Sequence, residues 1–371
     1  NIKTPDVVQH STGLIDDFIQ VVSGLVDRGY AYVAGGNVYF DTSKLGRYYV
    51  FNDHNEEDLA VGVREGVEED PNKRGKNDFV LWFTKSKFED QALKWDSPWG
   101  VGYPGWHIEC SCISMKFNGE YLDLHCGGID NAFPHHTNEI AQSEAYLGHP
   151  WCKQWFHVHH LNTSTGKISK SKGTKLTVSL LEEKGYDPLA YRFFCLQSHY
   201  RKGLVFSWEN LDNAAKAYQK LVRKIAALDP GDGEIAEGAV REHHNRFLEQ
   251  VGNDLNTAQG ITCLYDALKV RVNDATRLAI LADFDRVLSL SLLEKAAALR
   301  EKEAAQAKTA GGSGGFTVQG EGDEAVDALV LRRAEAKKAK NFAEADRIRD
   351  ELKAQGIEVT DVPGGAVWKR V

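Results

Sequence analysis

Two lysines and two serines lie close together in the stretch Lys167-Ile168-Ser169-Lys170-Ser171, and Gly173 follows shortly after. Lysine ammonium groups bind phosphate as compact charges, and serine hydroxyls add hydrogen bonds. The stretch therefore predicts a mobile loop that holds a polyphosphate. The same composition is common in solvated surface segments, so the stretch alone leaves both interpretations open.

Three residues on the N-terminal side of this loop have side chains that bind zinc. Pro134 suits the first turn of a helix, because its missing N–H would have no partner there, and we expect that helix to run from His135 to Leu147. His135 and Glu139 are four residues apart and would project from one helical face. The thiol of Cys110 could complete the group through the fold. The alternative is a His–Glu hydrogen bond on a helix surface beside a separately buried cysteine.

Apolar segments alternate with helices in this region, since an expected helix separates Tyr121–His125 from Trp155–Val158. That alternation predicts βαβ units and a parallel sheet. Gly127, Gly128 and Asp130 follow the first apolar segment, so they would lie where a strand ends. Ligands of open α/β sheets usually bind in that crevice. A plain turn is the alternative.

Four short motifs occur in one order within about 70 residues: Gly105-Trp106-His107-Ile108-Glu109-Cys110-Ser111, Gly127-Gly128-Ile129-Asp130, Pro134-His135-His136-Thr137-Asn138-Glu139 and the Lys167–Ser171 loop. Together they resemble the cysteinyl-tRNA synthetases, a family of class I aminoacyl-tRNA synthetases. The resemblance covers nearly all of the 371 residues. It implies an α/β, Rossmann-type catalytic domain whose N-terminal part is missing, then an α-helical bundle and a small C-terminal anticodon-binding module.

The resemblance also implies a zinc ion (Zn2+) held by two cysteines, one histidine and one glutamate. Such a zinc binds the thiolate of the substrate cysteine and excludes serine, because a hydroxyl is a poor partner for this borderline-soft ion. Cys110, His135 and Glu139 match three of the four ligand positions. The fourth, an early cysteine of the catalytic domain, has no counterpart in this sequence.

Further roles follow from the resemblance, with L-cysteine and ATP (with Mg2+) as substrates. Trp106 and His107 would shape the aminoacyl pocket, and Asp130 would hold the cysteine ammonium. Lys170, assisted by Lys167, would stabilise charge that develops on the α-phosphate, and positioning and electrostatics would suffice without a protein nucleophile. The expected ATP-binding residues are Lys167, Ser169, Lys170, Ser171, Gly127 and Gly128.

Three histidines, His157, His159 and His160, precede the phosphate loop near a strand end. They could bind a second metal ion. We favour the interpretation in which they line or flank the ATP cleft.

Some features depart from the family pattern. Ile168 stands where methionine is usual, and Lys172-Gly173-Thr174-Lys175 adds two positive charges to the phosphate loop. None of the 13 histidines lies in the His-x-Gly-His signature that holds the ATP phosphates in the family. We therefore expect an N-terminally truncated synthetase which, as it stands, has negligible activity in cysteine activation.

The composition is that of an ordinary globular protein, with 26% charged and 42% hydrophobic residues. A length of 371 residues predicts two or three domains. The six cysteines lack the spacing of a disulfide framework, and no apolar run approaches the roughly 18 residues of a membrane span. We expect a cytoplasmic protein without a membrane segment. The net charge of −8 means that nucleic-acid binding must come from local patches.

Residues 1–104 resemble the connective insertion between the two Rossmann halves of class I synthetases, and residues 105–190 the second half of the catalytic domain. The expected elements of the insertion are a helix at 11–28 capped by Ser11 or Thr12, a hairpin at 29–41, an exposed polar excursion at 52–76 and a buried strand at 79–83.

Residues 191–308 are expected to form a stem-contact region and a helical bundle. The segment Leu196–Arg201 resembles the one that braces the catalytic domain against the inner corner of the tRNA. Apolar spacing predicts helices at 214–228, 240–251, 261–272 and 277–304. The glycine-rich run Gly311–Gly315 predicts a flexible linker over residues 309–330.

Residues 331–371 contain ten Lys and Arg against seven Asp and Glu, and they include Phe342 and Trp368. A small basic module with aromatic residues can stack on bases and hold phosphates, although a solvated basic helix has the same composition. The resemblance makes this segment the anticodon-binding module. Asp346, Asp361 and Trp368 are then the candidates for contacts with anticodon bases.

These observations predict a cysteinyl-tRNA synthetase that activates L-cysteine with ATP and transfers it to tRNA(Cys), and we expect a monomer. Two alternatives remain at this stage. One is a ligase that joins cysteine to a small amino-sugar acceptor, which the tRNA-type C-terminal segment disfavours. The other is a non-catalytic tRNA-binding remnant, which the missing ATP signature favours.

Overall fold

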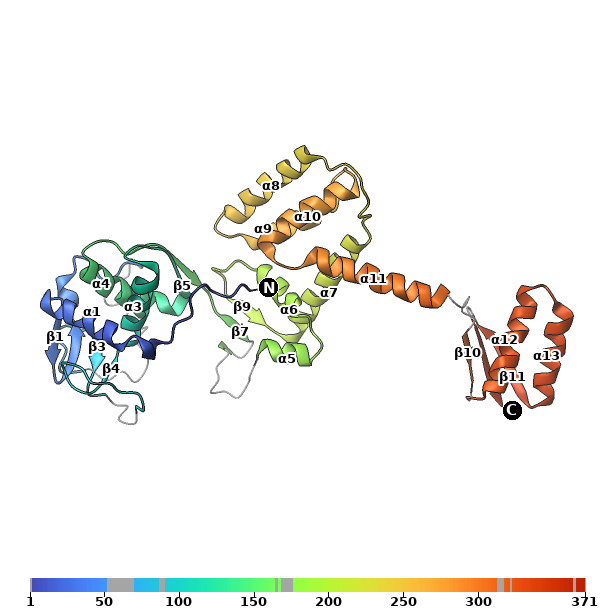
Figure 1. Ribbon diagram of the computed structural model, residues 1–371, viewed down its shortest axis with the longest axis horizontal. Helices are drawn as coiled ribbons and strands as arrows, with labels where there is room; N and C mark the ends of the chain where they lie inside the picture. Colours follow the sequence, from blue (N-terminus) through green and yellow to red (C-terminus); the bar gives the residue numbers. More distant parts are fainter. Residues whose placement is uncertain are drawn as a thin grey trace. The chain divides into compact units, whose positions relative to one another are not determined.

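A computed structural model describes residues 2–51, 70–86, 91–163, 166–167, 176–311, 317–320, 322–362 and 365–370. The chain divides into two compact units, Asn1–Tyr218 with Asn245–Cys263, and Gln219–His244 with Leu264–Val371. Figure 1 labels their helices and strands. Most of the expected polar excursion, residues 52–69, lies outside the described residues. No helix in the described ranges is long and apolar enough to cross a lipid bilayer.

An antiparallel sheet forms the first part of the first unit. Its strands, in spatial order, are β1 (Ala31–Ala34), β2 (Asn37–Phe40), β3 (Phe79–Phe83) and β4 (Tyr103–Pro104). The hairpin of β1 and β2 confirms the expectation, and its turn residues Gly35 and Gly36 adopt positive φ angles of 58° and 98°. The predicted strand β3 is also confirmed, with Leu81 and Trp82 fully buried.

Helix α1 (Ile15–Asp27) contributes Phe18, Val22 and Leu25 to the core of this part of the unit. The expected helix is therefore present, but the expected cap is wrong. Ser11 and Thr12 lie in a separate 3-10 turn, and Leu14 occupies the N-cap position without a side-chain hydrogen bond.

The α/β part of the unit consists of α3 (Trp106–Asn118), β5 (Leu122–Gly128), α4 (Thr137–Leu147) and β6 (Cys152–Val158). Strands β5 and β6 pair in parallel, which confirms the predicted βαβ arrangement. Pro134 does not begin α4, contrary to expectation. It lies in a π-helical turn, Ala132–His136, and the preceding Phe133 is extended at φ −140° and ψ 134°, as the steric demand of a following proline favours.

The next sheet along the chain is smaller, and two helices lie between its strands β8 and β9 in the sequence. Its strands, in spatial order, are β8 (Gly166–Lys167), β7 (Leu161–Thr163) and β9 (Leu204–Phe206). The helices here are α5 (Val178–Glu183) and α6 (Pro188–Leu196). Asp187 caps α6 by accepting a hydrogen bond from the Leu189 N–H, and Pro188 occupies the first turn.

The predicted helical region is confirmed, with changed boundaries. It contains α7 (Trp208–Ala226), α8 (Glu237–Gly252), α9 (Thr257–Ala267), α10 (Asp274–Leu288) and α11 (Leu292–Gly311). The single helix expected at 277–304 is wrong, because α10 and α11 are separate. Ser289 and Ser291 adopt left-handed φ angles of 58° and 50°, and the Asp285 carboxylate accepts hydrogen bonds from the backbone N–H groups of Leu290 and Leu292.

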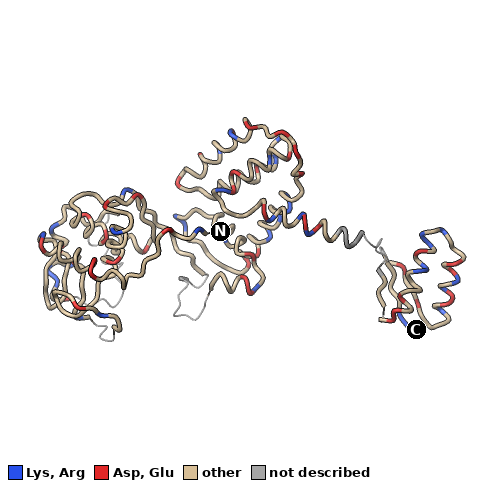
Figure 2. The backbone as a smooth tube through the Cα atoms, in the orientation of Figure 1, with Lys and Arg blue, Asp and Glu red and all other residues tan. Residues whose placement is uncertain are grey.

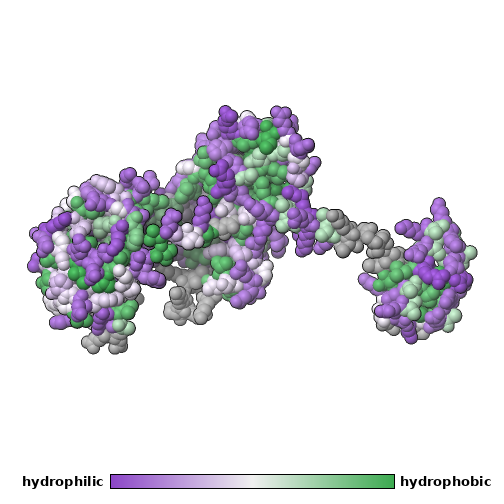
Figure 3. All heavy atoms as spheres, in the orientation of Figure 1, coloured by the Kyte–Doolittle hydropathy of each residue, from purple (hydrophilic) through white to green (hydrophobic). Residues whose placement is uncertain are grey.

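The C-terminal module starts earlier in the chain than we expected. It comprises β10 (Thr317–Gln319), α12 (Glu324–Lys338), α13 (Phe342–Ala354), β11 (Ile357–Val362) and β12 (Gly365–Arg370), with sheet order β10-β12-β11. Residues 317–319 and 324–330, which we expected in a linker, therefore belong to β10 and α12. Val330, Ile348, Leu352 and Trp368 form its buried core, while polar and apolar side chains mix on the visible surface (Figure 3).

A buried carboxylate joins three segments of the first unit. Asp78 is 2% exposed and accepts hydrogen bonds from the Tyr32 hydroxyl, from the N–H and hydroxyl of Thr42, and from the Gly75 N–H, at 2.8 to 2.9 Å. Burial alone would raise the pKa of Asp78, but these hydrogen bonds outweigh burial and hold the pKa below its ordinary value.

Replacing Asp78 by alanine is expected to destabilise the first unit by about 3 kcal/mol, because four donors around this buried carboxylate lose their acceptor. Thermal unfolding followed by circular dichroism should show a lower midpoint for D78A, whereas D16A, at the surface-facing start of α1, should unfold like the wild type. Equal midpoints for D78A and wild type would show that the network is dispensable.

Candidate functional site

The structure brings Cys110, His135 and Glu139 together, as the sequence predicts. Cys110 lies in α3, His135 in the π-helical turn, and Glu139 in the first turn of α4. Each offers a ligand atom within 4.8 Å of the other two. His135 Nε2 lies 3.0 Å from Glu139 Oε1. We call these three residues the thiol group.

Glu139 is the centre of this arrangement, and its side chain is fully buried. Its Oε2 atom lies 2.9 Å from His125 Nε2. Burial alone would raise the pKa of Glu139, but the contacts with His125 and His135 outweigh burial and lower the pKa. Glu139 is therefore an ionised carboxylate at neutral pH, ready to bind a cation.

The thiol group fits a zinc ion. His135 Nδ1 is buried and has no hydrogen-bond partner among the described residues, and Glu139 Oε1 makes no other contact in this group than the one of 3.0 Å with His135 Nε2. Burial raises the pKa of the Cys110 thiol to about 12, and the negative charges of Glu139 and Glu109 act in the same direction. A divalent cation would bind these buried nitrogen and oxygen atoms, and it would lower the pKa of Cys110 by favouring the thiolate. Sulfur, nitrogen and oxygen donors together are the usual zinc ligands.

Trp106 and His107 lie beside the thiol group, where the expected aminoacyl pocket would be. The Trp106 ring packs on His135 with centroids 4.1 Å apart, yet 59% of Trp106 is exposed. His107 packs edge-on against Phe79, and its Nε2 lies 3.3 Å from the carbonyl oxygen of Val80. Burial lowers the pKa of His107 to about 4, so this ring is neutral at physiological pH.

Gly127, Gly128 and Asp130 lie where β5 ends, as predicted. The two glycines are the last residues of the strand, and Asp130 lies in the 3-10 turn that follows. A Cβ atom on Gly128 would lie 2.5 Å from Asp130 Oδ1, so any other residue here would displace this carboxylate from its observed position. Asp130 Oδ1 also lies 3.7 Å from His160 Nε2.

The predicted phosphate loop is largely outside the described residues. Ser169, Lys170 and Ser171 fall in the undescribed range 168–175, and Lys167 is described only through its backbone in β8. Their assignment to ATP therefore stays a prediction.

Sequence reasoning did not select His125, and it did not place His136 or His157 next to Glu139. His125 lies in β5, His136 in the π-helical turn and His157 in β6. His136 is buried, its Nε2 lies 4.0 Å from Glu139 Oε1, and its Nδ1 lies 2.8 Å from His157 Nε2. The three-residue spacing of His136 and Glu139 was a signal, because such pairs meet on a helical surface. His125 and His157 come together only through the parallel register of β5 and β6.

An aromatic segment from the insertion packs on one of these histidines, His157. Phe51 contacts the rings of Trp155 and His157 edge-on, with centroids 5.3 and 5.0 Å apart. The Tyr48 hydroxyl donates a hydrogen bond of 2.5 Å to Asn138 Oδ1 in α4. The insertion therefore helps to enclose the site.

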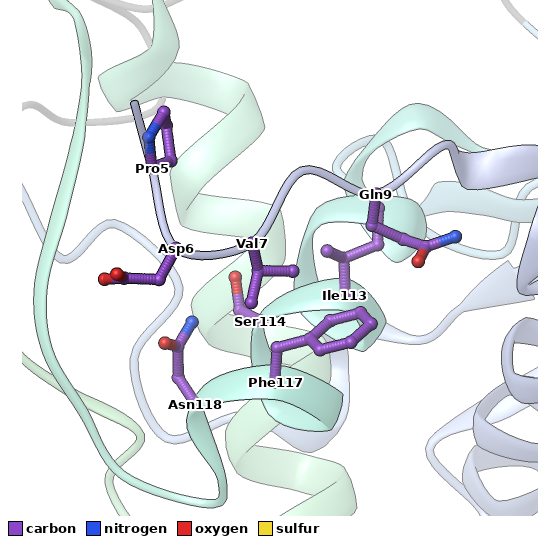
Figure 4. Close-up of a pocket in the computed structure, with 8 residues that line it drawn as sticks. All are labelled: Pro5, Asp6, Val7, Gln9, Ile113, Ser114, Phe117 and Asn118. Atoms are coloured by element: carbon purple, nitrogen blue, oxygen red, sulfur yellow. The ribbon is translucent and has the colours of Figure 1, made fainter. Parts of the chain in front are cut away.

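A hollow of about 280 Å³ lies elsewhere on α3. Figure 4 shows the N-terminal segment passing over the C-terminal turns of this helix, whereas the thiol group lies toward its beginning. The lining residues are Pro5, Asp6, Val7, Gln9, Ile113, Ser114, Phe117 and Asn118. None of them is a candidate site residue.

Trp368, which we expected to contact an anticodon base, is a core residue of the C-terminal module. It is 2% exposed, and its indole N–H donates a 2.6 Å hydrogen bond to Asp327. A Cβ atom on Gly320 would lie 2.0 Å from its ring. The ring has no free face for stacking in this structure, because the sheet position that it occupies points toward the helices.

Asp346 and Asp361 lie at the surface of the module. Asp346 forms an ion pair of 3.3 Å with Arg349. Asp361 accepts hydrogen bonds from both terminal nitrogens of the buried Arg333, at 2.8 and 3.1 Å, and from Lys337 at 2.5 Å. These contacts with Arg333 and Lys337 lower the pKa of Asp361 to about 2.

This arrangement gives a prediction for acid titration. The carboxyl of Asp361 should titrate about two units below a free aspartate, whose pKa is about 3.9. Because the folded-state pKa is the lower one, the stabilisation by this ion pair is present above pH 4 and is lost as the pH falls toward 2. A carboxyl carbon NMR titration, with D361N to assign the signal, would measure this pKa. A value near 4 would mean that the ion pair is absent in solution.

Phe342 is an exposed aromatic residue that the sequence analysis did not select. It is the first residue of α13 and is 63% exposed. Its ring is therefore accessible for stacking on a base, whereas Trp368 is explained by packing.

The folded module is not basic overall. Residues 317–371 include Glu321, Asp323, Glu324 and Asp327, so eleven acidic residues accompany ten basic ones. Both signs alternate along α12 and α13 (Figure 2). The excess of basic residues in 331–371 is therefore balanced over the whole module, and any RNA contact must depend on local groups.

Comparisons with known proteins agree with this architecture. Residues 1–216 match a family described as tRNA synthetases class I (C) catalytic domain, and residues 319–368 match one described as cysteinyl-tRNA ligase anticodon binding domain. A cysteine–tRNA ligase of Treponema denticola is 39% identical over 394 residues, which cover 100% of this chain and 77% of that protein. One of Treponema pallidum is 37% identical, with coverage of 100% and 78%, and one of Borrelia hermsii is 36% identical, with coverage of 100% and 76%.

Proposed function

The chain belongs to the cysteinyl-tRNA synthetase family, and on that premise we propose that the protein expressed from its complete reading frame activates L-cysteine with ATP and transfers the cysteinyl group to tRNA(Cys). This makes it a ligase of protein synthesis. We further propose that it acts as a cytoplasmic monomer.

One observation carries the proposal at the level of the site. The ligand atoms of Cys110 and His135 lie close to the buried carboxylate of Glu139. When bound there, zinc would supply a soft Lewis-acid partner for the thiolate of cysteine and a poor one for the hydroxyl of serine. A site built on that difference rejects serine without a separate editing step.

The residues around the thiol group would fix the remaining parts of the amino acid. Trp106 is exposed and lies against His135, so it can pack on a bound cysteine. Asp130 lies at the carboxyl end of the parallel sheet and would pair with the cysteine ammonium. His107 is neutral and enclosed, and it would shape the pocket without adding charge.

ATP would bind along the same edge of the sheet. Gly127 and Gly128 would lie beside the nucleotide at the end of β5, and Lys167, Ser169, Lys170 and Ser171 would close over the phosphates. The carboxylate of cysteine attacks the α-phosphorus, the bond to the β-phosphate oxygen breaks, and pyrophosphate leaves. Lys170 and Lys167 would stabilise the charge on the oxygens of the α-phosphate during this step.

The C-terminal module would bind the anticodon stem-loop. We propose Phe342 for stacking on a base, because its ring is exposed at the start of α13. Asp346 and Asp361 would accept hydrogen bonds from base amino groups, with Asp361 held in place by Arg333. The burial of Trp368 speaks against its direct contact with RNA, so we assign it to the core.

Aminoacylation assays would separate this function from the two alternatives. The synthetase should attach radiolabelled cysteine to tRNA(Cys) and should not charge tRNA(Ser). A ligase for an amino-sugar acceptor would consume ATP and cysteine without any tRNA, and a non-catalytic remnant would bind tRNA without turnover. Either of those two outcomes would contradict the proposal.

A further inference from the structure

We propose that His125, His136 and Glu139 form a second binding site for a divalent transition-metal cation, adjacent to the thiol group. The inference depends on the proposed function only in that both sites use Glu139. Each of the three residues offers a ligand atom within 4.8 Å of the others. Two imidazoles and one carboxylate are the ligand set of several zinc enzymes.

Glu139 can serve two cations because its oxygens face different partners. Oε1 lies 3.0 Å from His135 Nε2 in the thiol group, and Oε2 lies 2.9 Å from His125 Nε2. In sites with two metal ions, the cations are about 3.5–4 Å apart and share bridging ligands. The carboxylate is fully buried, so it is available only to ligands inside the site.

His136 is oriented as a metal-binding histidine. Its Nδ1 lies 2.8 Å from His157 Nε2, so the opposite nitrogen, Nε2, faces the carboxylate. Nε2 lies 4.0 Å from Glu139 Oε1, which is too long for a hydrogen bond. One ring nitrogen of His136 lies within 4.8 Å of a ligand atom of His125 and of Glu139, a spacing that suits ligands of one cation after a small inward movement. Metal-bound histidines usually have their second ring nitrogen hydrogen-bonded, and His157 would provide that outer contact.

The surroundings keep these rings in place. A Cβ atom on Gly127 would lie 2.5 Å from Cε1 and 2.8 Å from Nε2 of His136, so only glycine lets this ring lie against β5. The Trp155 ring packs on both His125 and His136, with centroids 4.9 Å apart in each pair. An aromatic shell of this kind excludes water and fixes ligand orientation.

The competing explanation is that His125 only donates a hydrogen bond to Glu139 and thereby orients a ligand of the thiol group. That explanation predicts one cation per chain. The second site predicts two. The number of bound cations therefore separates the explanations.

Cobalt titration of the 371-residue chain tests the proposal. We expect two equivalents of Co2+, of which one produces a thiolate-to-cobalt charge-transfer band from Cys110. H136N keeps a polar atom near His157 but removes Nε2, and we expect the second equivalent to bind at least about 100-fold more weakly while the band remains. H10N removes an exposed histidine outside the cluster and should behave like the wild type.

Binding of a single equivalent by the wild type, or of two equivalents by H136N with unchanged affinity, would overturn the second site. C110S keeps the two sites distinguishable. This variant should lose the charge-transfer band and still bind Co2+ at the second site. An unchanged band would instead show that Cys110 is not a ligand in the thiol group. Circular dichroism spectra that match the wild type would confirm that each variant is folded.

Discussion

Replacing Glu139 with alanine is expected to lower the affinity of the chain for its tightest-bound zinc ion by more than 100-fold. Loss of even an outer-shell partner typically costs about 10–100-fold, and Glu139 is a direct ligand in our account. The substitution also leaves His125 and His135 without their shared carboxylate. Competition with a chromophoric chelator would measure the affinity.

Glu109 provides a matched control for this experiment. It is adjacent to Cys110 in α3 and is also a glutamate, but it is not part of the thiol group. E109A should retain zinc affinity within a few-fold of the wild type. Equal zinc affinity in E139A and E109A would remove Glu139 from the ligand set and with it the basis for cysteine selection.

Replacing Phe342 with alanine is expected to weaken the binding of tRNA(Cys) by roughly 5- to 150-fold. Stacking of an aromatic side chain on a base is worth about 1–3 kcal/mol by alanine substitution, and 1.4 kcal/mol corresponds to tenfold. The stability of the module should stay unchanged, because the ring is 63% exposed and makes little contribution to the core. Filter binding at one fixed salt concentration would measure the affinity.

Two controls assign such a loss to stacking. F342W should bind like the wild type, since the indole ring also stacks on bases. L331A removes an exposed apolar side chain from α12 and should leave the affinity unchanged. If F342A and L331A bind tRNA(Cys) equally well, Phe342 is not part of the RNA-binding surface.

Local patterns in the sequence predict those parts of the fold that depend on neighbouring residues. The hairpin of β1 and β2 follows from Gly35-Gly36, and strand β3 from its apolar run. The convergence of His135 and Glu139 follows from their spacing, even though His135 lies before α4 rather than in it. An i,i+4 pair meets in a helical turn as well as in a helix, so the error in the helix start did not affect the site.

Features that depend on distant residues could not be predicted in this way. His125 and His157 join the site through the register of two parallel strands, which no local pattern specifies. Trp368 looks like an exposed aromatic in a basic tail, but its position in β12 turns it toward α12 and the Asp327 carboxylate. The predicted linker extended too far along the chain, because strand β10 is short and its partner strand β12 is nearly fifty residues away.

The break between α10 and α11 shows another limit. Residues 277–304 have continuous helical periodicity, and serine does not forbid a helix. The break arises because the Asp285 side chain binds the N–H groups of Leu290 and Leu292 and so replaces helical hydrogen bonds there. Competition of this kind depends on side-chain geometry rather than on composition.

Amino-acid-dependent exchange of pyrophosphate into ATP tests the central claim most directly. The assay would use protein expressed from its complete reading frame, with each of the twenty amino acids in turn and with zinc present. Our account predicts exchange with cysteine, none above background with serine, and loss of the cysteine signal in C110S. Exchange driven by another amino acid, or exchange with cysteine that survives in C110S, would contradict it.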